Sequence, residues 1–282
     1  MNNKIALITG ANSGVGFATA LGLAAQGYDL ILVVRSINKA NDTKIRILGQ
    51  YPSTKIDYEI ADLEDLKSVK VAAQNIKARY TKIDRLICNA GYSADEILFT
   101  TEGYEKSFLA NHQGHFVLTN SLLALLEASG EGRVISVSSA AHALGKVKRF
   151  FVKNDPNTSA FKAYGDGKLA NILFTKGLAK RLENKPVLAF CLHPGVVGTN
   201  FGSNLTGFSG LMVKIAQPFM ISSEKGAATS IYLATTPQKN ISKFNGGYFD
   251  KCKPKHTFNK DINNENINWF WQKSEAVAQE IG

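Results

Sequence analysis

Residues 6–16, ALITGANSGVG, join a short apolar segment to a glycine-rich turn and the start of a helix. The apolar residues do not alternate with polar ones, which is typical of a strand that is buried on both faces. Gly10, Gly14 and Gly16 let the backbone bend sharply and let an anionic ligand approach closely. Free N–H groups at the start of the helix favour a phosphate. The stretch therefore predicts a phosphate-binding turn, with an ordinary tight turn as the alternative.

The glycine spacing differs from the dinucleotide fingerprint Gly-x-Gly-x-x-Gly, because three residues separate Gly10 from Gly14 and one separates Gly14 from Gly16. The position of the turn supports the phosphate-binding interpretation. It lies close behind Met1, after a strand-like segment and before a helix-like one, which is the context that such a turn requires.

The chain has 282 residues, of which 44% are hydrophobic, enough for a sizeable core. No linker, repeat or low-complexity tract divides the sequence, so we expect one domain over residues 1–282. The 3 cysteines are scattered and no Cys or His cluster has metal-ligand spacing, which predicts a reducing compartment and no metal site. The sequence contains no apolar run of about 18 residues and leaves no room for a signal peptide, so we expect a cytoplasmic protein.

The formal net charge of +10 raises the question of nucleic acid or an anionic membrane as a partner. Acids lie between the basic residues along the expected helices, and only Lys251–Lys260 (KCKPKHTFNK) is densely basic. We interpret the charge as a solvated surface. We therefore expect no nucleic-acid partner and no transmembrane segment, and weak peripheral membrane contact stays open.

Apolar strand-like segments alternate with helical patterns, which indicates a parallel sheet covered by helices on both faces. The expected fold class is α/β, a single-domain, doubly wound, Rossmann-type sheet of about seven strands. The strands are expected at 5–8, 30–34, 56–60, 85–88, 133–138, 187–192 and 248–249, and the helices at 13–26, 39–48, 66–80, 102–128, 164–182, 223–233 and 268–281. Residues 200–222 are apolar but interrupted by glycines, and we interpret them as a substrate lid.

Polar residues follow most of the expected strands, at the carboxyl ends of the strands, where ligands of such folds bind. These residues are Thr9, Arg35, Asp62, Asn89, Ser139 and His193. Each alone is an ordinary loop residue, but their joint position predicts a ligand site.

Over nearly its whole length the sequence resembles the short-chain dehydrogenase/reductase family. The resemblance rests on Thr9-Gly10-x-x-x-Gly14-x-Gly16, Asp62-Leu63, Asn89-Ala90-Gly91, Asn111, Ser139, Tyr164-x-x-x-Lys168 and Pro194-Gly195-Val196-Val197-Gly198-Thr199. The stretches VSSAAHALGK, AYGDGKLANILFTKGLAKRL, LHPGVVGT and GGYFDKCKP resemble its retinol-dehydrogenase-like branch. That branch often carries an N-terminal membrane anchor, which we do not expect here.

The candidate catalytic residues follow from the chemistry of carbonyl reduction. A carbonyl that accepts a hydride needs a proton, which a positioned phenol can donate. Tyr164 is the candidate donor, and Lys168, one helical turn away, is expected to lower the pKa of the phenol. The resemblance implies that Lys168 also binds the nicotinamide ribose, that Ser139 holds the substrate oxygen and that Asn111 orients a water molecule. Ser138 is the alternative to Ser139.

The resemblance implies a nicotinamide cofactor held by Gly10, Asn12, Ser13, Gly14, Val15, Gly16, Arg35, Asp62, Leu63, Asn89, Ala90, Gly91, Tyr164, Lys168, Pro194, Gly195, Val197 and Thr199. An NAD site has an acid about 20 residues past the glycines, at the end of the second strand. Val34 occupies that place and Arg35 follows it. Because a guanidinium binds the extra phosphate of NADP, we expect NADP(H) to be preferred over NAD(H), with a surface role of Arg35 as the alternative.

One departure from the family pattern is Gly165-Asp166-Gly167, since many relatives carry Ser immediately before the lysine. Each glycine destabilises a helix by about 1 kcal/mol relative to alanine. Packing must therefore hold Tyr164 in place.

The apolar lid predicts a lipophilic aldehyde or ketone as substrate, with reduction as the expected direction. Permanent packing of residues 200–222, or their membrane contact, is the alternative. A cofactor-binding regulator or scaffold on the same fold is the alternative to an enzyme. A homodimer through the helices that contain Asn111 and Tyr164 is implied by the resemblance alone. Packing roles are expected for His142, His193, Cys88, Trp269 and Trp271.

Overall fold

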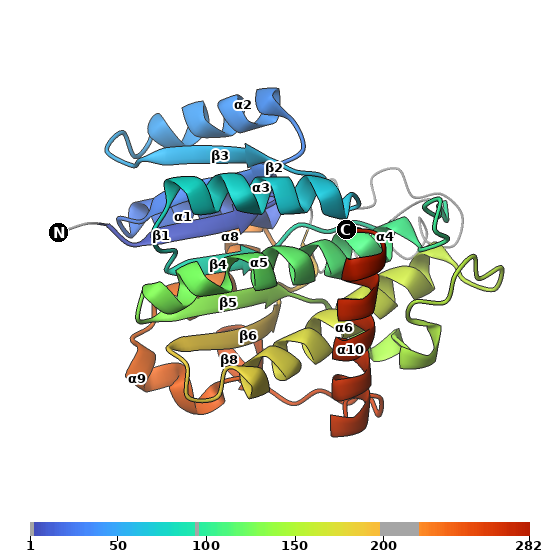
Figure 1. Ribbon diagram of the computed structural model, residues 1–282. Coiled ribbons are helices and arrows are strands. Elements are labelled where there is room, and N and C mark those ends of the chain that lie inside the picture. The colour runs from blue at the N-terminus through green and yellow to red at the C-terminus, as the bar shows by residue number, and fades with distance from the viewer. Residues whose placement is uncertain (1–2, 94–95, 198–219) are drawn as a thin grey trace.

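An eight-stranded sheet forms the centre of the computed structural model, which describes residues 3–93, 96–197 and 220–282 (Figure 1). The strands are β1 (Ile5–Thr9), β2 (Asp29–Val34), β3 (Ile56–Ile60), β4 (Arg85–Cys88), β5 (Gly132–Val137), β6 (Val187–His193), β7 (Tyr248–Asp250) and β8 (Lys253–Lys255). Their order is β3-β2-β1-β4-β5-β6-β7-β8; the pairings from β3 to β7 are parallel, and β8 is antiparallel to β7. The strand order reverses between β1 and β4, where ligands of doubly wound sheets bind.

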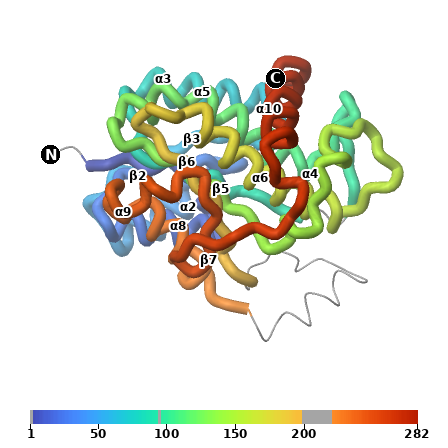
Figure 2. The backbone as a smooth tube through the Cα atoms, turned by 90° about the horizontal axis from the view of Figure 1, so that it is seen from below, coloured from blue at the N-terminus to red at the C-terminus, as the bar shows by residue number. Residues whose placement is uncertain are grey.

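Helices cover both faces of the sheet (Figure 2). They are α1 (Gly14–Ala25), α2 (Ile37–Leu48), α3 (Leu66–Arg79), α4 (Lys106–Phe108), α5 (Gly114–Ala128), α6 (Ala160–Arg181), α8 (Ser223–Thr235), α9 (Gln238–Ile241) and α10 (Asn264–Glu280), with short turns η1 (Leu109–Gln113), η2 (Ala140–Leu144), η3 (Val147–Arg149) and η5 (Ser242–Phe244). Side chains of α3, α5, α6 and α10 form one core, and those of α1, α2, α8 and α9 form the other. Successive strand residues alternate between the two cores, as Leu7 and Ile8 do, which explains why the strand sequences are apolar without interruption.

The expected elements are present, with differences that have local causes. The expected helix over 102–128 begins at Lys106, because the Glu105 carboxylate accepts hydrogen bonds from the backbone N–H groups of Ser107 and Phe108 and so caps α4. It is then interrupted by η1, a π-helical turn. The helix expected over 164–182 begins a turn earlier, after the cap residue Ser159. The eighth strand, β8, was not expected; its three residues are exposed at the edge of the sheet, within the basic segment.

Helix α10 packs across α6 and the π-helical turn (Figure 1). The Trp271 ring stacks on Phe174 of α6, with 5.9 Å between ring centroids, and lies edge-on to Phe116 of α5 at 5.0 Å. Gln113 Nε2 donates a hydrogen bond of 2.6 Å to the carbonyl oxygen of Ser274. The chain therefore covers this face of α5 and α6 with its own helix.

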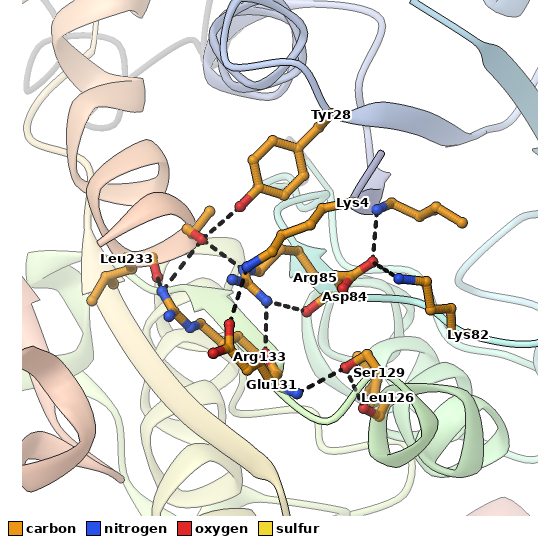
Figure 3. A network of polar contacts seen from close by, with 12 residues as sticks. Lys4, Tyr28, Lys82, Asp84, Arg85, Leu126, Ser129, Glu131, Arg133 and Leu233 are labelled. Atoms are coloured by element: carbon orange, nitrogen blue, oxygen red, sulfur yellow. Dashed lines mark hydrogen bonds and ion pairs between the residues drawn. The ribbon is translucent and has the colours of Figure 1, made fainter. Parts of the chain in front are cut away.

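Two buried arginines lie side by side (Figure 3) at the amino ends of β4 and β5, whereas the expected ligand site lies at the carboxyl ends of the strands. Arg85 and Arg133 are paired in register on β4 and β5. Arg85 Nε donates to the carbonyl oxygen of Ala234 at 2.6 Å, and Arg133 Nη1 donates to that of Leu233 at 2.6 Å. Both cations thus face the C-terminal end of α8, where the helix dipole is negative, and fix that end of the helix.

Candidate active site

A cavity of about 630 Å³ opens at the carboxyl ends of the strands. Its lining includes every expected cofactor-binding residue that the structure describes: Gly10, Asn12, Ser13, Gly14, Val15, Gly16, Arg35, Asp62, Leu63, Asn89, Ala90, Gly91, Tyr164, Lys168, Pro194, Gly195 and Val197. Ser139 lines the cavity as well. Thr199 and residues 200–219 of the expected lid lie outside the described residues. The geometry thus brings residues from Gly10 to Val197, far apart in the sequence, to one site.

The glycine turn depends on the absence of side chains. Gly10 and Gly14 have φ angles of +65° and +53°, which favour glycine. A Cβ atom on Gly16 would collide with the Gly10 carbonyl oxygen and with the Asn89 side chain. Asn89 Nδ2 donates a hydrogen bond of 2.9 Å to the carbonyl oxygen of Thr9, so the Asn89 segment is fixed directly against the turn.

Thr9 connects three parts of the site. Its hydroxyl oxygen accepts hydrogen bonds of 2.9 Å from the backbone N–H groups of Asn89 and Ala90 and lies 2.8 Å from His115 Nε2. His115 Nδ1 lies 3.2 Å from the carbonyl oxygen of Asn111. Burial lowers the pKa of His115 to about 4, so its imidazole is neutral and can donate at one nitrogen and accept at the other. The sequence analysis missed this role of His115.

Two cations stand at the rim of the cavity near the end of β2. Arg35 and Lys39 both line the cavity and are both exposed. Lys39, which the sequence analysis did not name, lies in the first turn of α2, whereas Arg35 precedes the helix. Glu64 also lines the cavity, and its carboxylate accepts a hydrogen bond of 2.8 Å from the Tyr92 hydroxyl.

The candidate catalytic pair, Tyr164 and Lys168, lies on α6. Lys168 Nζ is 5.4 Å from the centroid of the Tyr164 ring and donates a hydrogen bond of 3.2 Å to the carbonyl oxygen of Val137. Burial raises the pKa of Tyr164 to about 12, although a hydrogen bond with Ser139 opposes the rise. Burial also lowers the pKa of Lys168 to about 8. The expected fall of the Tyr164 pKa toward neutrality is therefore wrong for the protein alone, because removal of the phenol from water outweighs its hydrogen bond with Ser139.

Asn111 lies in the π-helical turn, directly behind the cavity wall. Its Nδ2 donates hydrogen bonds of 2.7 Å to the carbonyl oxygens of Tyr92 and Ser107. Its Oδ1 is buried and has no hydrogen-bond partner among the described residues. A Cβ atom on Gly91 would collide with this oxygen and lie 3.0 Å from Lys168 Nζ. Gly91 therefore keeps the space between Asn111 and Lys168 free of side chain.

The two serines at the end of β5 differ in their contacts. The Ser138 hydroxyl is buried and donates a hydrogen bond of 2.7 Å to the carbonyl oxygen of Lys168. The Ser139 hydroxyl accepts one from the backbone N–H of Ala141 at 3.2 Å and bonds to Tyr164. These contacts favour Ser139 over Ser138 as the serine that meets a substrate beside Tyr164.

Among the remaining residues for which packing roles are expected, His142 and Cys88 are buried. The His142 ring lies 5.1 Å from the ring of Tyr248. His193 lies at the end of β6, partly buried. All three cysteines are free. Within residues 3–93, 96–197 and 220–282, no group of three or more His, Cys, Asp or Glu side chains could hold a metal ion.

The family of the chain follows from its sequence. The family model for short chain dehydrogenase matches residues 4–209, and the chain belongs to this family of oxidoreductases. It is similar to retinol dehydrogenases over most of its length. It is 34% identical to retinol dehydrogenase 12 of Mus musculus, over 96% of this chain and 85% of that protein. It is also 34% identical to retinol dehydrogenase 14 of Homo sapiens, over 99% of this chain and 87% of that protein.

Solved structures show the same fold. An uncharacterized protein from Mycobacterium paratuberculosis superposes with a TM-score of 0.75 at 28% identity, over 98% of this chain and 93% of that chain. An alcohol dehydrogenase from Thermococcus sibiricus, complexed with 5-hydroxy-NADP, has a TM-score of 0.64 at 23% identity, over 84% of this chain and 92% of that chain. Among the described residues, no helix is long and apolar enough to span a membrane.

Proposed function

We propose that this protein is an NADP(H)-dependent oxidoreductase that interconverts a lipophilic aldehyde or ketone and its alcohol. One observation carries the proposal: Tyr164, Lys168 and Ser139 line the same cavity as the glycine turn of β1. A proton donor, a cation and a polar group for the substrate oxygen thus lie beside a phosphate-binding turn. This is the combination that hydride transfer to a carbonyl requires.

The cavity fits a dinucleotide. Its glycines keep side chains out of the turn, and the buried Asn111 Oδ1, without a partner among the described residues, lies behind Gly91. The N-terminal N–H groups of α1 favour the pyrophosphate, and Lys168 is expected to bind the nicotinamide ribose. Arg35 and Lys39 would pair with the extra phosphate of NADP. When bound, the nicotinamide supplies or takes up the hydride.

The protein's own residues handle the proton and the substrate oxygen. With its pKa raised to about 12, Tyr164 is protonated at neutral pH and can donate to the oxygen of a carbonyl that is being reduced. The Ser139 hydroxyl, bonded to Tyr164, would hold that oxygen. Asn111 is expected to orient a water molecule that exchanges protons with Lys168.

The lipophilic substrate is inferred from the residues expected to form the lid. Val197, which lines the cavity, pairs with Ile221 in an isolated parallel bridge, so the described residues on the two sides of 198–219 lie next to each other beside the site. The relatives named for retinol act on a lipophilic alcohol, which supports this substrate class. A homodimer, if formed, would need a surface other than the face of α5 and α6 that α10 covers.

The test measures the change in nicotinamide absorbance with a panel of aldehydes and ketones of increasing chain length. Turnover that improves with chain length supports the proposal. Tyr164→Phe should retain NADPH binding and lose at least about 100-fold in kcat, the effect of removing a positioned proton donor. NADPH binding without turnover of any carbonyl would instead indicate the non-catalytic regulator.

Cofactor preference has its own test. Arg35→Ala should weaken NADPH binding at least about tenfold and leave NADH binding nearly unchanged, because only NADPH carries the extra phosphate. The exposed Lys180, on α6, provides the control as Lys180→Ala, which removes a cation away from the cavity. An equal loss for both cofactors would contradict the phosphate contact.

A further inference from the structure

The catalytic helix carries an acid between two glycines, Gly165-Asp166-Gly167, in the interval between Tyr164 and Lys168. All three residues are buried in the interior of α6, where each glycine costs about 1 kcal/mol relative to alanine. Residues that weaken the catalytic helix need a compensating contact. The structure shows one on each side of the helix.

The glycines let neighbouring backbone approach α6 closely. A Cβ atom on Gly165 would lie 3.1 Å from the carbonyl oxygen of Ala141, and one on Gly145 would lie 2.7 Å from the carbonyl oxygen of Gly165. On the other side, a Cβ atom on Gly167 would lie 2.9 Å from Asn111 Cβ. The segment that follows Ser139 and the turn that carries Asn111 therefore both rest directly on the catalytic helix.

Asp166 stabilises the contact between α6 and the segment that follows Ser139. It is 4% exposed, and its carboxylate accepts two hydrogen bonds from Arg149, at 2.8 Å from Nε and 2.6 Å from Nη2. It also accepts one of 2.8 Å from the backbone N–H of Lys146, while Arg149 Nη2 donates to the carbonyl oxygen of Leu144 at 2.9 Å. This arrangement, the Asp166–Arg149 latch, holds residues 140–149 against α6 by a two-pronged, charge-assisted contact.

The same segment is held from its other side by residues that follow β8. Asn259 Nδ2 donates to the carbonyl oxygens of His142 and Gly145, at 2.8 Å and 2.9 Å. The Asp261 carboxylate accepts a hydrogen bond of 2.8 Å from the backbone N–H of Val147. Residues 140–149 are thus fixed between two groups of side chains, and Ser139 lies at the start of the segment.

We infer that Asp166 and Arg149 are positioning residues that set the Ser139 hydroxyl against Tyr164 for the carbonyl substrate. The inference rests on the proposed function. Neither residue lines the cofactor cavity, so the latch acts on the site through residues 140–149, the segment that follows Ser139. Its loss should therefore lower kcat/KM for the carbonyl substrate and leave cofactor affinity nearly unchanged.

Asp166→Asn tests the latch because it keeps the size of the side chain and removes its charge. We expect kcat/KM for the carbonyl substrate to fall at least about tenfold, since misplacement of a contact group by a fraction of an ångström is costly. The NADPH dissociation constant should change less than about twofold. Arg149→Lys, which keeps the charge but cannot bind with two prongs, should act in the same direction, and the two effects should not add.

Asp84→Asn is the matched control. Asp84 is 2% exposed, accepts a hydrogen bond of 2.8 Å from the backbone N–H of Ile5 and pairs with Lys82 at 3.6 Å (Figure 3). It lies at the amino end of β4, whereas Ser139 follows the carboxyl end of β5. Its substitution removes a buried charge of the same kind far from Ser139. It should lower the melting temperature to a similar extent and leave kcat/KM unchanged. Equal losses of kcat/KM in Asp166→Asn and Asp84→Asn, or none in Asp166→Asn, would overturn the inference.

Hydrogen exchange separates failure of the latch from failure of the proposed function. The amide of Lys146 should exchange at least about tenfold faster in Asp166→Asn, whereas amides of α1 should not change. If the wild-type protein turns over no carbonyl, the proposed function fails, and the role of the latch in holding the segment is judged by exchange alone. Unchanged exchange at Lys146 would overturn the latch whatever the activity.

Discussion

Replacing Lys168 by methionine should stabilise the cofactor-free protein while it abolishes catalysis. Lys168 is 4% exposed, and its ammonium donates to a carbonyl oxygen, that of Val137, at 3.2 Å. Burial lowers its pKa from 10.5 to about 8. At about 1.4 kcal/mol per pH unit, keeping Lys168 protonated costs the folded state about 3 kcal/mol at pH 7. The charge is therefore maintained at the expense of stability.

The expected gain is smaller than this cost because methionine loses the hydrogen bond to Val137, worth about 1 kcal/mol. The Val137 carbonyl oxygen is not left unpaired, since Asn171 Nδ2 also donates to it at 3.2 Å. The net increase in the free energy of unfolding is about 2 kcal/mol at pH 7.

The stability gain of Lys168→Met should decrease as the pH rises. Folded Lys168 loses its proton above about pH 8, whereas unfolded Lys168 keeps it up to about pH 10.5, so the wild-type protein gains stability as pH rises through this window. The advantage of Lys168→Met is therefore full below about pH 8 and disappears near pH 10.

Urea unfolding at pH 7 and at about pH 10, followed by circular dichroism without cofactor, measures the difference in the free energy of unfolding between Lys168→Met and the wild type. Lys180→Met, on the exposed side of the same helix, is the control and should show no gain at either pH. A Lys168→Met protein that is less stable than the wild type at pH 7, or equally stabilised at both pH values, would refute the reasoning.

Three further predictions concern packing, the space behind the cavity and pH. Trp271→Ala should lower the free energy of unfolding by about 3–5 kcal/mol, because the indole is 4% exposed between two phenylalanine rings; a loss below about 1 kcal/mol in urea unfolding would contradict this packing. Gly91→Ala should lower kcat at least about 100-fold and destabilise the fold by about 1–3 kcal/mol, since the new methyl group would collide with the buried Asn111 Oδ1; a normal kcat would argue against this geometry. The rate of alcohol oxidation should rise throughout about pH 7–10, because Tyr164, with its pKa raised to about 12, must lose its proton to act as a base; a plateau below about pH 9 in the measured profile would be inconsistent with this shift.

The main features of the sheet could be predicted because its strands are buried on both faces. An uninterrupted apolar segment such as residues 30–34 is typical of a strand that is buried on both faces. Because such strands are parallel, the residues that follow them lie together at the carboxyl ends of the strands. The exposed β8 strand was missed for the opposite reason, since its sequence, Lys-Pro-Lys, carries no apolar pattern.

Contacts between distant segments could not be predicted from the sequence. The spacing of Tyr164 and Lys168 predicts that they share a helix face, but it does not show how far burial raises the pKa of one and lowers that of the other. Nor does any local pattern pair Asp166 with Arg149, or place the π-helical turn at Asn111 within an apparently continuous helix. These features depend on which backbone segments pack against α6.

The position of α10 in the chain has a consequence for the order in which the site matures. Gln113, within two residues of Asn111, receives its hydrogen-bond acceptor from Ser274, near the C-terminal end of the sequence. As the ribosome makes the chain from its N-terminus, the glycine turn and the strands β1 to β6 are synthesised well before this acceptor, and β7 and β8 only shortly before it. The π-helical turn that carries Asn111 can make its contact with α10 only after residues 264–280 have left the ribosome, so the strands that form the candidate cofactor cavity precede the last contact of this turn.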